Sequence, residues 1–250
     1  MNLFSVRQVS LLLAAFALSA CGQTGQLEET CTGAKCEKTV NAPVAPETPP
    51  GVPAPPQAPS VPSASYRFPE FDPDWKMGRA TYEKMKAYYN RNLDLIPNAR
   101  YATIVDFSQP SSHHRFYLFD LKAGTVELHA TSHGKNSDPD NDGFPTEFSN
   151  TVDSLQSSLG FYLTLKTYNG SHGYSLRLRG LESTNSKAEE RDIVMHPADY
   201  VSDANNYAGR SFGCPAVDPK YSKKIIDRLR DGSLLLIDYD ASEARKWRNR

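Results

Sequence analysis

Hydrophobic and polar residues alternate in three separate segments of this chain. The segments are VELHA at residues 126–130, FYLTLK at 161–166 and YSLRLR at 174–179. A period of two places alternate side chains on one face, as in a half-buried strand. Denser apolar runs predict further strands, some buried on both faces, at YATIVDF (101–107), RFYLFDL (115–121), DIVM (192–195) and LLLIDY (234–239).

Two helices are predicted by apolar residues at helical spacing. The first spans residues 76–91, with apolar side chains at positions i, i+3 and i+7. The second begins with Asp218 as N-cap and Pro219 at the first helical position, and it stops near Gly232. Its predicted buried residues are Tyr221, Ile225 and Leu229. Many strands with two peripheral helices indicate a mainly β fold, either a sandwich or a small barrel-like sheet.

The first 20 residues have the order of an export signal. Arg7 is followed by an apolar run over residues 9–20, which is too short for a permanent transmembrane helix. Leu18-Ser19-Ala20-Cys21 resembles a bacterial lipobox, which implies cleavage before Cys21 and a lipid on its thiol. The alternative is a plain signal peptide with a chance cysteine. Gly22, rather than Asp, after the cysteine favours a periplasm-facing anchor in the outer membrane.

Residues 21–65 form a predicted tether. Nine of the 18 prolines lie between Pro43 and Pro62, and aromatic residues are absent there. This composition favours an extended spacer over a packed core. Residues 66–250 are then one predicted globular domain. No other segment is apolar enough to span a membrane.

The charge balance argues against nucleic acid as a partner. The chain has 28 basic and 29 acidic residues, so no basic footprint is expected. The basic tail ARKWRNR is predicted to be a solvated end. The chain also has four cysteines. Lipid accounts for Cys21, and Cys31 and Cys36 are close enough to pair in an oxidising compartment, which leaves Cys214 as a candidate reactive thiol.

Catalysis by a thiol needs a base and donors for the oxyanion. His196 ends a predicted strand, and the 17 residues before Cys214 can return the cysteine to it. Gly213 frees the backbone, so we expect the Gly213 and Cys214 amides to approach an acyl oxygen. Ser211 is expected to position a substrate carbonyl or the leaving group, and Arg210 to lower the thiol pKa.

The sequence IVMHPADYV…GRSFGCPAV resembles the signature of YkuD-type L,D-transpeptidases. Over residues 101–217 the chain is most similar to the subgroup described as murein L,D-transpeptidase catalytic domain. The resemblance implies an L,D-transpeptidase-type β-sandwich with peripheral helices and no cofactor. The chain departs from the usual pattern at Phe212, where a histidine is usual, and at Pro215 and Ala216.

The resemblance also implies a two-step acyl transfer on peptidoglycan stem peptides. Cys214 attacks the amide between diaminopimelate and D-Ala, and His196 passes the thiol proton to the departing D-Ala. A diaminopimelate amine on a second stem then gives a 3-3 crosslink, whereas water as acceptor gives a carboxypeptidase. A non-catalytic peptidoglycan-binding lipoprotein with a buried Cys214 is the other alternative. In NlpC/P60 peptidases the cysteine precedes the histidine, and in sortases the histidine and the cysteine are more widely spaced. Neither family therefore fits the order and spacing of His196 and Cys214.

Other polar residues are weaker candidates for the site. His133 and His172 each precede a glycine and are expected either to line the cleft or to serve as turn residues. Arg177 and Arg179 alternate on one strand face and suit substrate carboxylates. A partial calcium-loop pattern places Asp138, Asp140, Asp142 and Gly143 at its first, third, fifth and sixth positions. Because Ser149 stands where the loop has Glu, a polar turn without metal is favoured.

Overall fold

The computed structural model describes residues 66–205 and 207–250 of the 250-residue chain. The predicted signal (1–20) and tether (21–65) lie outside these residues, as do Cys21, Cys31 and Cys36. These parts of the sequence analysis stay predictions. Within the described residues, no helix has both the length and the apolar character needed to cross a bilayer.

A mixed sheet organises the described domain. Its strand order is β3-β2-β1-β11-β5-β6-β7, and every neighbouring pair is antiparallel except β1 with β11. The bounds are β1 Tyr101–Asp106, β2 Phe116–Asp120, β3 Thr125–His129, β5 Gly160–Gly170, β6 Gly173–Gly180, β7 Val194–Met195 and β11 Leu234–Asp238. These strands include all seven predicted from the sequence.

Two short ribbons complete the strands of the described domain. β4 (His133–Gly134) pairs in parallel with β10 (Arg210–Ser211). β8 (Val201–Ser202) pairs antiparallel with β9 (Tyr207–Ala208). The β4–β10 ribbon brings the segment before the candidate nucleophile next to His133, which lies far away in the sequence.

Three α-helices occur in the described residues: α1 (Arg79–Arg91), α2 (Pro219–Leu229) and α3 (Ala241–Arg248). α2 begins as predicted, with the Asp218 carboxylate accepting a hydrogen bond from the Lys220 N–H at 2.8 Å. α1 starts three residues later than predicted, because Lys76 adopts a left-handed φ of 65° after a short 3-10 helix at Pro73–Trp75. The basic tail, residues 244–250, is mostly exposed as predicted, although α3, capped by Asp240, extends into it.

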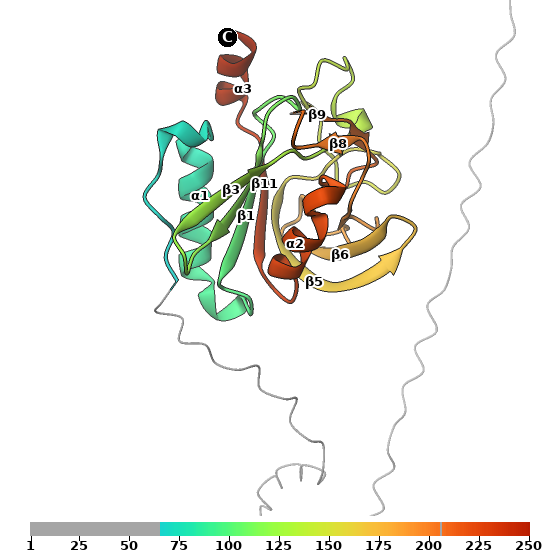
Figure 1. Cartoon of the computed structure of the whole chain (residues 1–250). Helices are drawn as coiled ribbons and strands as arrows, with labels where there is room; N and C mark the ends of the chain where they lie inside the picture. Colours follow the sequence, from blue (N-terminus) through green and yellow to red (C-terminus); the bar gives the residue numbers. More distant parts are fainter. Residues whose placement is uncertain (1–65, 206) are drawn as a thin grey trace, which may run out of the picture. The chain divides into compact units, whose positions relative to one another are not determined.

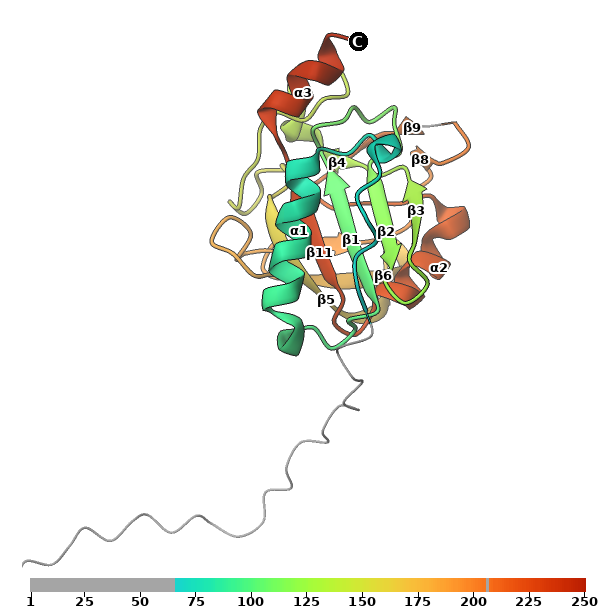
Figure 2. The ribbon, with the colours of Figure 1, turned by 90° about the vertical axis from the view of Figure 1, so that its left-hand side faces the viewer.

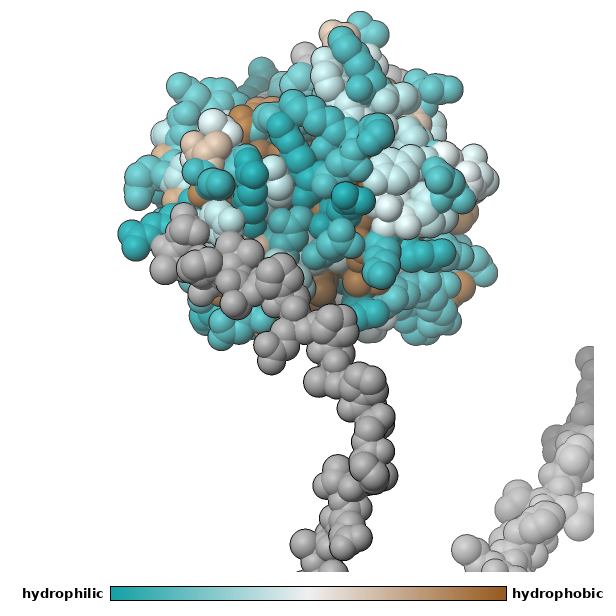
Figure 3. Space-filling view, turned by 60° about the horizontal axis from the view of Figure 1, so that its bottom comes forward, coloured by the Kyte–Doolittle hydropathy of each residue, from teal (hydrophilic) through white to brown (hydrophobic). Residues whose placement is uncertain are grey.

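The central strands are covered on both faces. Along β11, Leu234 and Leu236 pack in a cluster with α1, whereas Leu235 and Ile237 pack in a second cluster with α2. Figures 1 and 2 show α1 and α2 on opposite sides of these strands, with β5 and β6 curving around α2. The mainly β fold with peripheral helices is therefore confirmed. The face of the domain in Figure 3 is mainly hydrophilic.

The predicted alternation fails in β5. Thr164 was expected to be exposed but is fully buried, because its hydroxyl bonds to the Leu229 carbonyl at 2.5 Å and its Oγ accepts from the Ser233 N–H at 2.8 Å. The β5–β6 register also shifts between Thr164 and Thr167. A bulge of this kind breaks the period of two on which the prediction depended.

Candidate active site

His196 follows directly after β7, at the end of the sheet. Its Nδ1 lies 2.9 Å from the Pro197 carbonyl, so Nδ1 carries the proton and Nε2 is left as the acceptor. The chain returns beside this histidine at Val217. The Val217 N–H donates to the His196 carbonyl at 3.0 Å, and the Ala198 N–H donates to the Val217 carbonyl at 3.1 Å. These bonds tie the base to the segment that follows Cys214.

The turn before Cys214 is held by the Ser211 hydroxyl. Ser211 Oγ donates to the Cys214 carbonyl at 2.7 Å and accepts the Gly213 N–H at 3.0 Å. Gly213 has a φ of +125°, and a Cβ there would lie 2.7 Å from the Gln156 carbonyl oxygen. Only glycine combines this conformation with this close approach.

These contacts correct two expectations about the turn. The Gly213 N–H is already bonded to Ser211 and is not free for an acyl oxygen in this geometry. Ser211 is buried, and its hydroxyl serves the turn rather than a substrate carbonyl. The Cys214 N–H, by contrast, has no acceptor among the described residues. It is the better candidate of the two predicted oxyanion donors.

The Cys214 thiol is half-buried and lies between the backbone groups of Asp192 and Val194. Sγ accepts the Val194 N–H at 3.5 Å and donates to the Asp192 carbonyl at 3.7 Å. Burial raises the pKa of the thiol, while the Val194 N–H and then the Arg191 charge lower it. The net shift is upward, which favours a neutral thiol in the free protein.

The His196 imidazole is also kept neutral by its surroundings. Burial lowers its pKa, the Pro197 carbonyl opposes that shift, and His172 lowers the pKa further. The His172 and His196 rings stack with centroids 4.4 Å apart. His172 comes from the turn between β5 and β6, so this hairpin tip covers the base. A neutral imidazole is the form that can accept a thiol proton.

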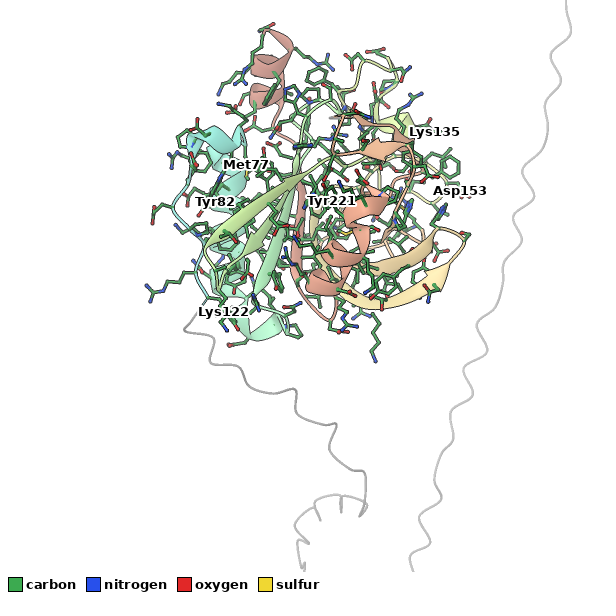
Figure 4. All side chains as sticks on the ribbon, viewed as in Figure 1. Met77, Tyr82, Lys122, Lys135, Asp153 and Tyr221 are labelled. Carbon is green, nitrogen blue, oxygen red and sulfur yellow. The ribbon has the colours of Figure 1, made fainter. Side chains whose placement is uncertain are left out.

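Cys214 and His196 line one cavity of about 550 Å³. The other polar and aromatic residues that line it come from β5, the β5–β6 turn, β6, the segments before β7 and β8, and the nucleophile turn. They are Tyr168, Ser171, His172, Arg177, Arg191, Asp192, Tyr200, Arg210, Ser211 and Phe212. A smaller cavity shares Arg191, Asp192 and Phe212 with the first and adds Asp153. Figure 4 shows Lys135 and Asp153 at the edge of the domain away from Met77 and Tyr82.

A family model described as L,D-transpeptidase catalytic domain matches residues 75–238. The chain belongs to this family. No curated protein sequence matches significantly.

Solved structures are also similar to the chain, and among them are two named L,D-transpeptidases. An L,D-transpeptidase from Mycobacterium smegmatis has 14% identity and a TM-score of 0.35, covering 56% of this chain and 58% of that one. L,D-transpeptidase 3 from Mycobacterium tuberculosis, with a faropenem-derived adduct, has 14% identity, a TM-score of 0.37 and coverages of 56% and 60%. Bd1075 from Bdellovibrio bacteriovorus has 16% identity, a TM-score of 0.35 and coverages of 60% and 53%. The alignments span less than two thirds of each of these chains.

Within this L,D-transpeptidase domain, the prediction that His133 lines the cleft is wrong. His133 is fully buried beneath the nucleophile turn, where Arg115 Nη2 donates to its Nδ1 at 2.7 Å. Its Nε2 lies 3.4 Å from the Asp138 carboxylate. Burial, followed by the charges of Arg115 and Arg210, lowers the pKa of His133 to about 2. The residue is neutral and accepts one hydrogen bond from Arg115, while its buried Nε2 has no hydrogen-bond partner among the described residues.

Burial of neutral His133 makes the stability of the domain depend on pH. An unfolded histidine takes up a proton below its ordinary pKa of about 6.5, whereas folded His133 stays neutral until about pH 2. The free energy of unfolding should therefore decrease as the pH is lowered from about 6.5 towards 2. This group alone contributes a decrease of up to about 1.4 kcal/mol per pH unit. Denaturant titrations of His133→Asn, whose amide oxygen can accept from Arg115, should show a shallower loss from pH 6 to 4. Parallel curves for both proteins would contradict this role.

The remaining predicted residues divide between the cavity and the turns. Arg210 lines the cavity, but its guanidinium donates to the carbonyls of Lys135 and Asp138. It does not lower the thiol pKa as predicted; Arg191 does. Arg177 lies in the cavity over the Tyr168 ring, whereas Arg179 pairs with Glu189 on the surface.

The aspartate-rich turn uses its own backbone groups. Asp138 Oδ1 accepts the Asp142 N–H at 3.1 Å, and Oδ2 accepts the Gly143 N–H at 3.0 Å. Within residues 66–205 and 207–250, no three His, Cys, Asp or Glu side chains are grouped so that they could hold a metal ion. The polar-turn interpretation describes this loop.

Proposed function

We propose that this L,D-transpeptidase family member acts on peptidoglycan stem peptides with Cys214 as its nucleophile. The observation that carries the proposal is that Cys214 and His196 line the same cavity, with Val217 bonded to the His196 backbone. The imidazole presents Nε2 as an acceptor because Nδ1 is bonded to Pro197. A cysteine and a neutral imidazole in one cavity supply the nucleophile and the base that thiol acyl transfer requires.

The first step transfers the acyl group to sulfur. The S–H bond turns from the Asp192 carbonyl toward His196, and Nε2 takes the proton as sulfur attacks the carbonyl carbon of diaminopimelate. The Cys214 N–H donates to the oxyanion that forms. When the carbon–nitrogen bond breaks, the His196 imidazolium returns the proton to the amine of D-Ala. The products of this step are a Cys214 thioester and free D-Ala.

The second step releases the acyl group to an amine. A diaminopimelate side-chain amine on a second stem attacks the thioester. His196 accepts the amine proton and gives it to the departing sulfur. The product is a 3-3 crosslink, and the free Cys214 thiol is restored. With water in place of the amine, the same atoms would yield a tripeptide. The lipid on Cys21 and the periplasm-facing outer-membrane location, both predicted from the sequence, would hold the domain near this polymer.

Product analysis tests the proposal. The purified protein is incubated with disaccharide-tetrapeptide, and the products are followed by mass spectrometry. We expect crosslinked dimers that have lost one D-Ala. Tripeptide alone would identify an L,D-carboxypeptidase. Unchanged tetrapeptide, together with a Cys214 thiol that a probe labels no faster than a model thiol below pH 8, would leave only a non-catalytic peptidoglycan-binding role.

A further inference from the structure

Arg191 connects the loop at residues 149–156 to the cavity. It lies three residues before β7, and its guanidinium donates through Nη1 to the Ser149 carbonyl at 2.7 Å. Nη2 donates to Ser154 Oγ at 3.2 Å and to the Gln156 carbonyl at 2.5 Å. Both ends of the fork are therefore fixed on one loop. Such a fork holds a position that a flexible lysine would not hold.

The same loop forms the wall behind the nucleophile turn. A Cβ on Gly213 would lie 2.7 Å from the Gln156 carbonyl oxygen and 3.3 Å from Arg191 Nη2. Ser157 Oγ donates to the Gly213 carbonyl at 3.3 Å. The guanidinium thus lies against the backbone of the residue that immediately precedes Cys214. Movement of Arg191 would release the wall and the turn together.

The charge of Arg191 is not matched by a carboxylate. Among the described residues Arg191 forms no ion pair, whereas Arg177 on β6 has Asp192 at 3.8 Å. The Arg210 guanidinium, on β10, donates hydrogen bonds to the Lys135 and Asp138 carbonyls. The other titratable groups around the thiol are Asp192, whose charge raises the thiol pKa, the Tyr162 and Tyr200 phenols, and the His172 and His196 imidazoles of the same cavity. Arg191 is the cation in this set that is both fixed beside the turn and unpaired.

We infer that Arg191 is a positioning residue that clamps the Gln156–Ser157 wall onto Gly213 and holds a positive charge beside the Cys214 sulfur. The effect on sulfur agrees with the direction in which the Arg191 charge moves the pKa of the thiol, opposing burial. In the reaction, this charge favours the thiolate as the proton leaves for His196. The catalytic consequence rests on the proposed function, whereas the effect on the thiol does not.

The pH dependence of Cys214 alkylation tests this inference. The full chain is treated with iodoacetamide, and labelling of the Cys214 peptide is followed by mass spectrometry. Arg191→Gln keeps a donor without the charge, and Arg191→Lys keeps the charge without the fork. We expect Arg191→Gln to move the alkylation midpoint to higher pH and to slow labelling near neutral pH on the order of tenfold. Arg191→Lys should move the midpoint less.

Arg179→Gln is the control, because Arg179 lies on the same strand as Arg177 but pairs with Glu189 on the surface, outside the cavity. Its alkylation midpoint should equal that of the unmodified protein. Equal midpoints for Arg191→Gln and the unmodified protein would overturn the inference, as would an equal shift in Arg179→Gln. A shifted midpoint without any turnover of tetrapeptide would support the role of Arg191 and contradict the proposed function. Turnover of tetrapeptide without a shifted midpoint would support the proposed function and contradict the role of Arg191.

Discussion

Cys214→Ser should abolish the turnover of disaccharide-tetrapeptide, lowering kcat/KM by about 10³-fold or more. A serine hydroxyl is a far weaker acid than a thiol. His196 cannot compensate, because burial lowers its pKa and so weakens it as a base. The substitution changes a single atom at a half-buried site, so the fold should persist. D-Ala release measures the rate, and thermal unfolding checks the fold.

The control for this variant is a substitution of a residue that shares the cavity without touching the thiol. Tyr168→Phe removes only a hydroxyl at the cavity wall and should retain most of the activity. A Cys214→Ser protein that releases D-Ala as fast as the Tyr168→Phe protein would show that sulfur does not carry the acyl group.

His196→Gln should lower kcat/KM by about 10²- to 10⁴-fold, the range usual for the loss of a general base. Glutamine approximates the shape of the imidazole but takes up no proton. The unmodified protein should also show an acid limb below the ordinary histidine pKa. The reason is that burial lowers the pKa of His196, so the neutral base persists as the pH falls. The profile of kcat/KM against pH measures both effects.

His172→Gln provides the comparison for the acid limb. His172 stacks on His196 and lowers its pKa, so its removal should move the acid limb to higher pH. The maximum rate should change far less than in His196→Gln. An acid limb that stays in place in His172→Gln and persists in His196→Gln would assign the titration to another group.

Local patterns in the sequence predicted much of the fold. The apolar run LLLIDY indicates a strand buried on both faces, and β11 packs against both hydrophobic clusters. Asp218-Pro219 marks the start of α2, because capping is determined by neighbouring residues. The buried Thr164 could not be predicted, since its partners at Leu229 and Ser233 are distant in the sequence.

The sequence predicted those residues of the candidate site whose role can be recognised from their immediate neighbours in the chain. Cys214 and His196 stand in recognisable surroundings, and the structure brings both to one cavity. Arg191 was overlooked because its acceptors lie on the loop at residues 149–156, which no local pattern links to Cys214. His133 was assigned to the cleft because Ser-His-Gly looks like a loop. Its burial follows from Arg115, a charge hidden inside the domain.

Mass spectrometry of the acyl-enzyme, trapped by an acid quench, tests the central claim most directly. The protein is mixed with disaccharide-tetrapeptide, quenched in acid and digested, and the Cys214 peptide is examined. The predicted result is a thioester on Cys214 whose mass equals the stem without its D-Ala, and which disappears when an amine acceptor is added. Release of D-Ala at the full rate by Cys214→Ser, or an acyl group on another residue, would contradict a Cys214 nucleophile.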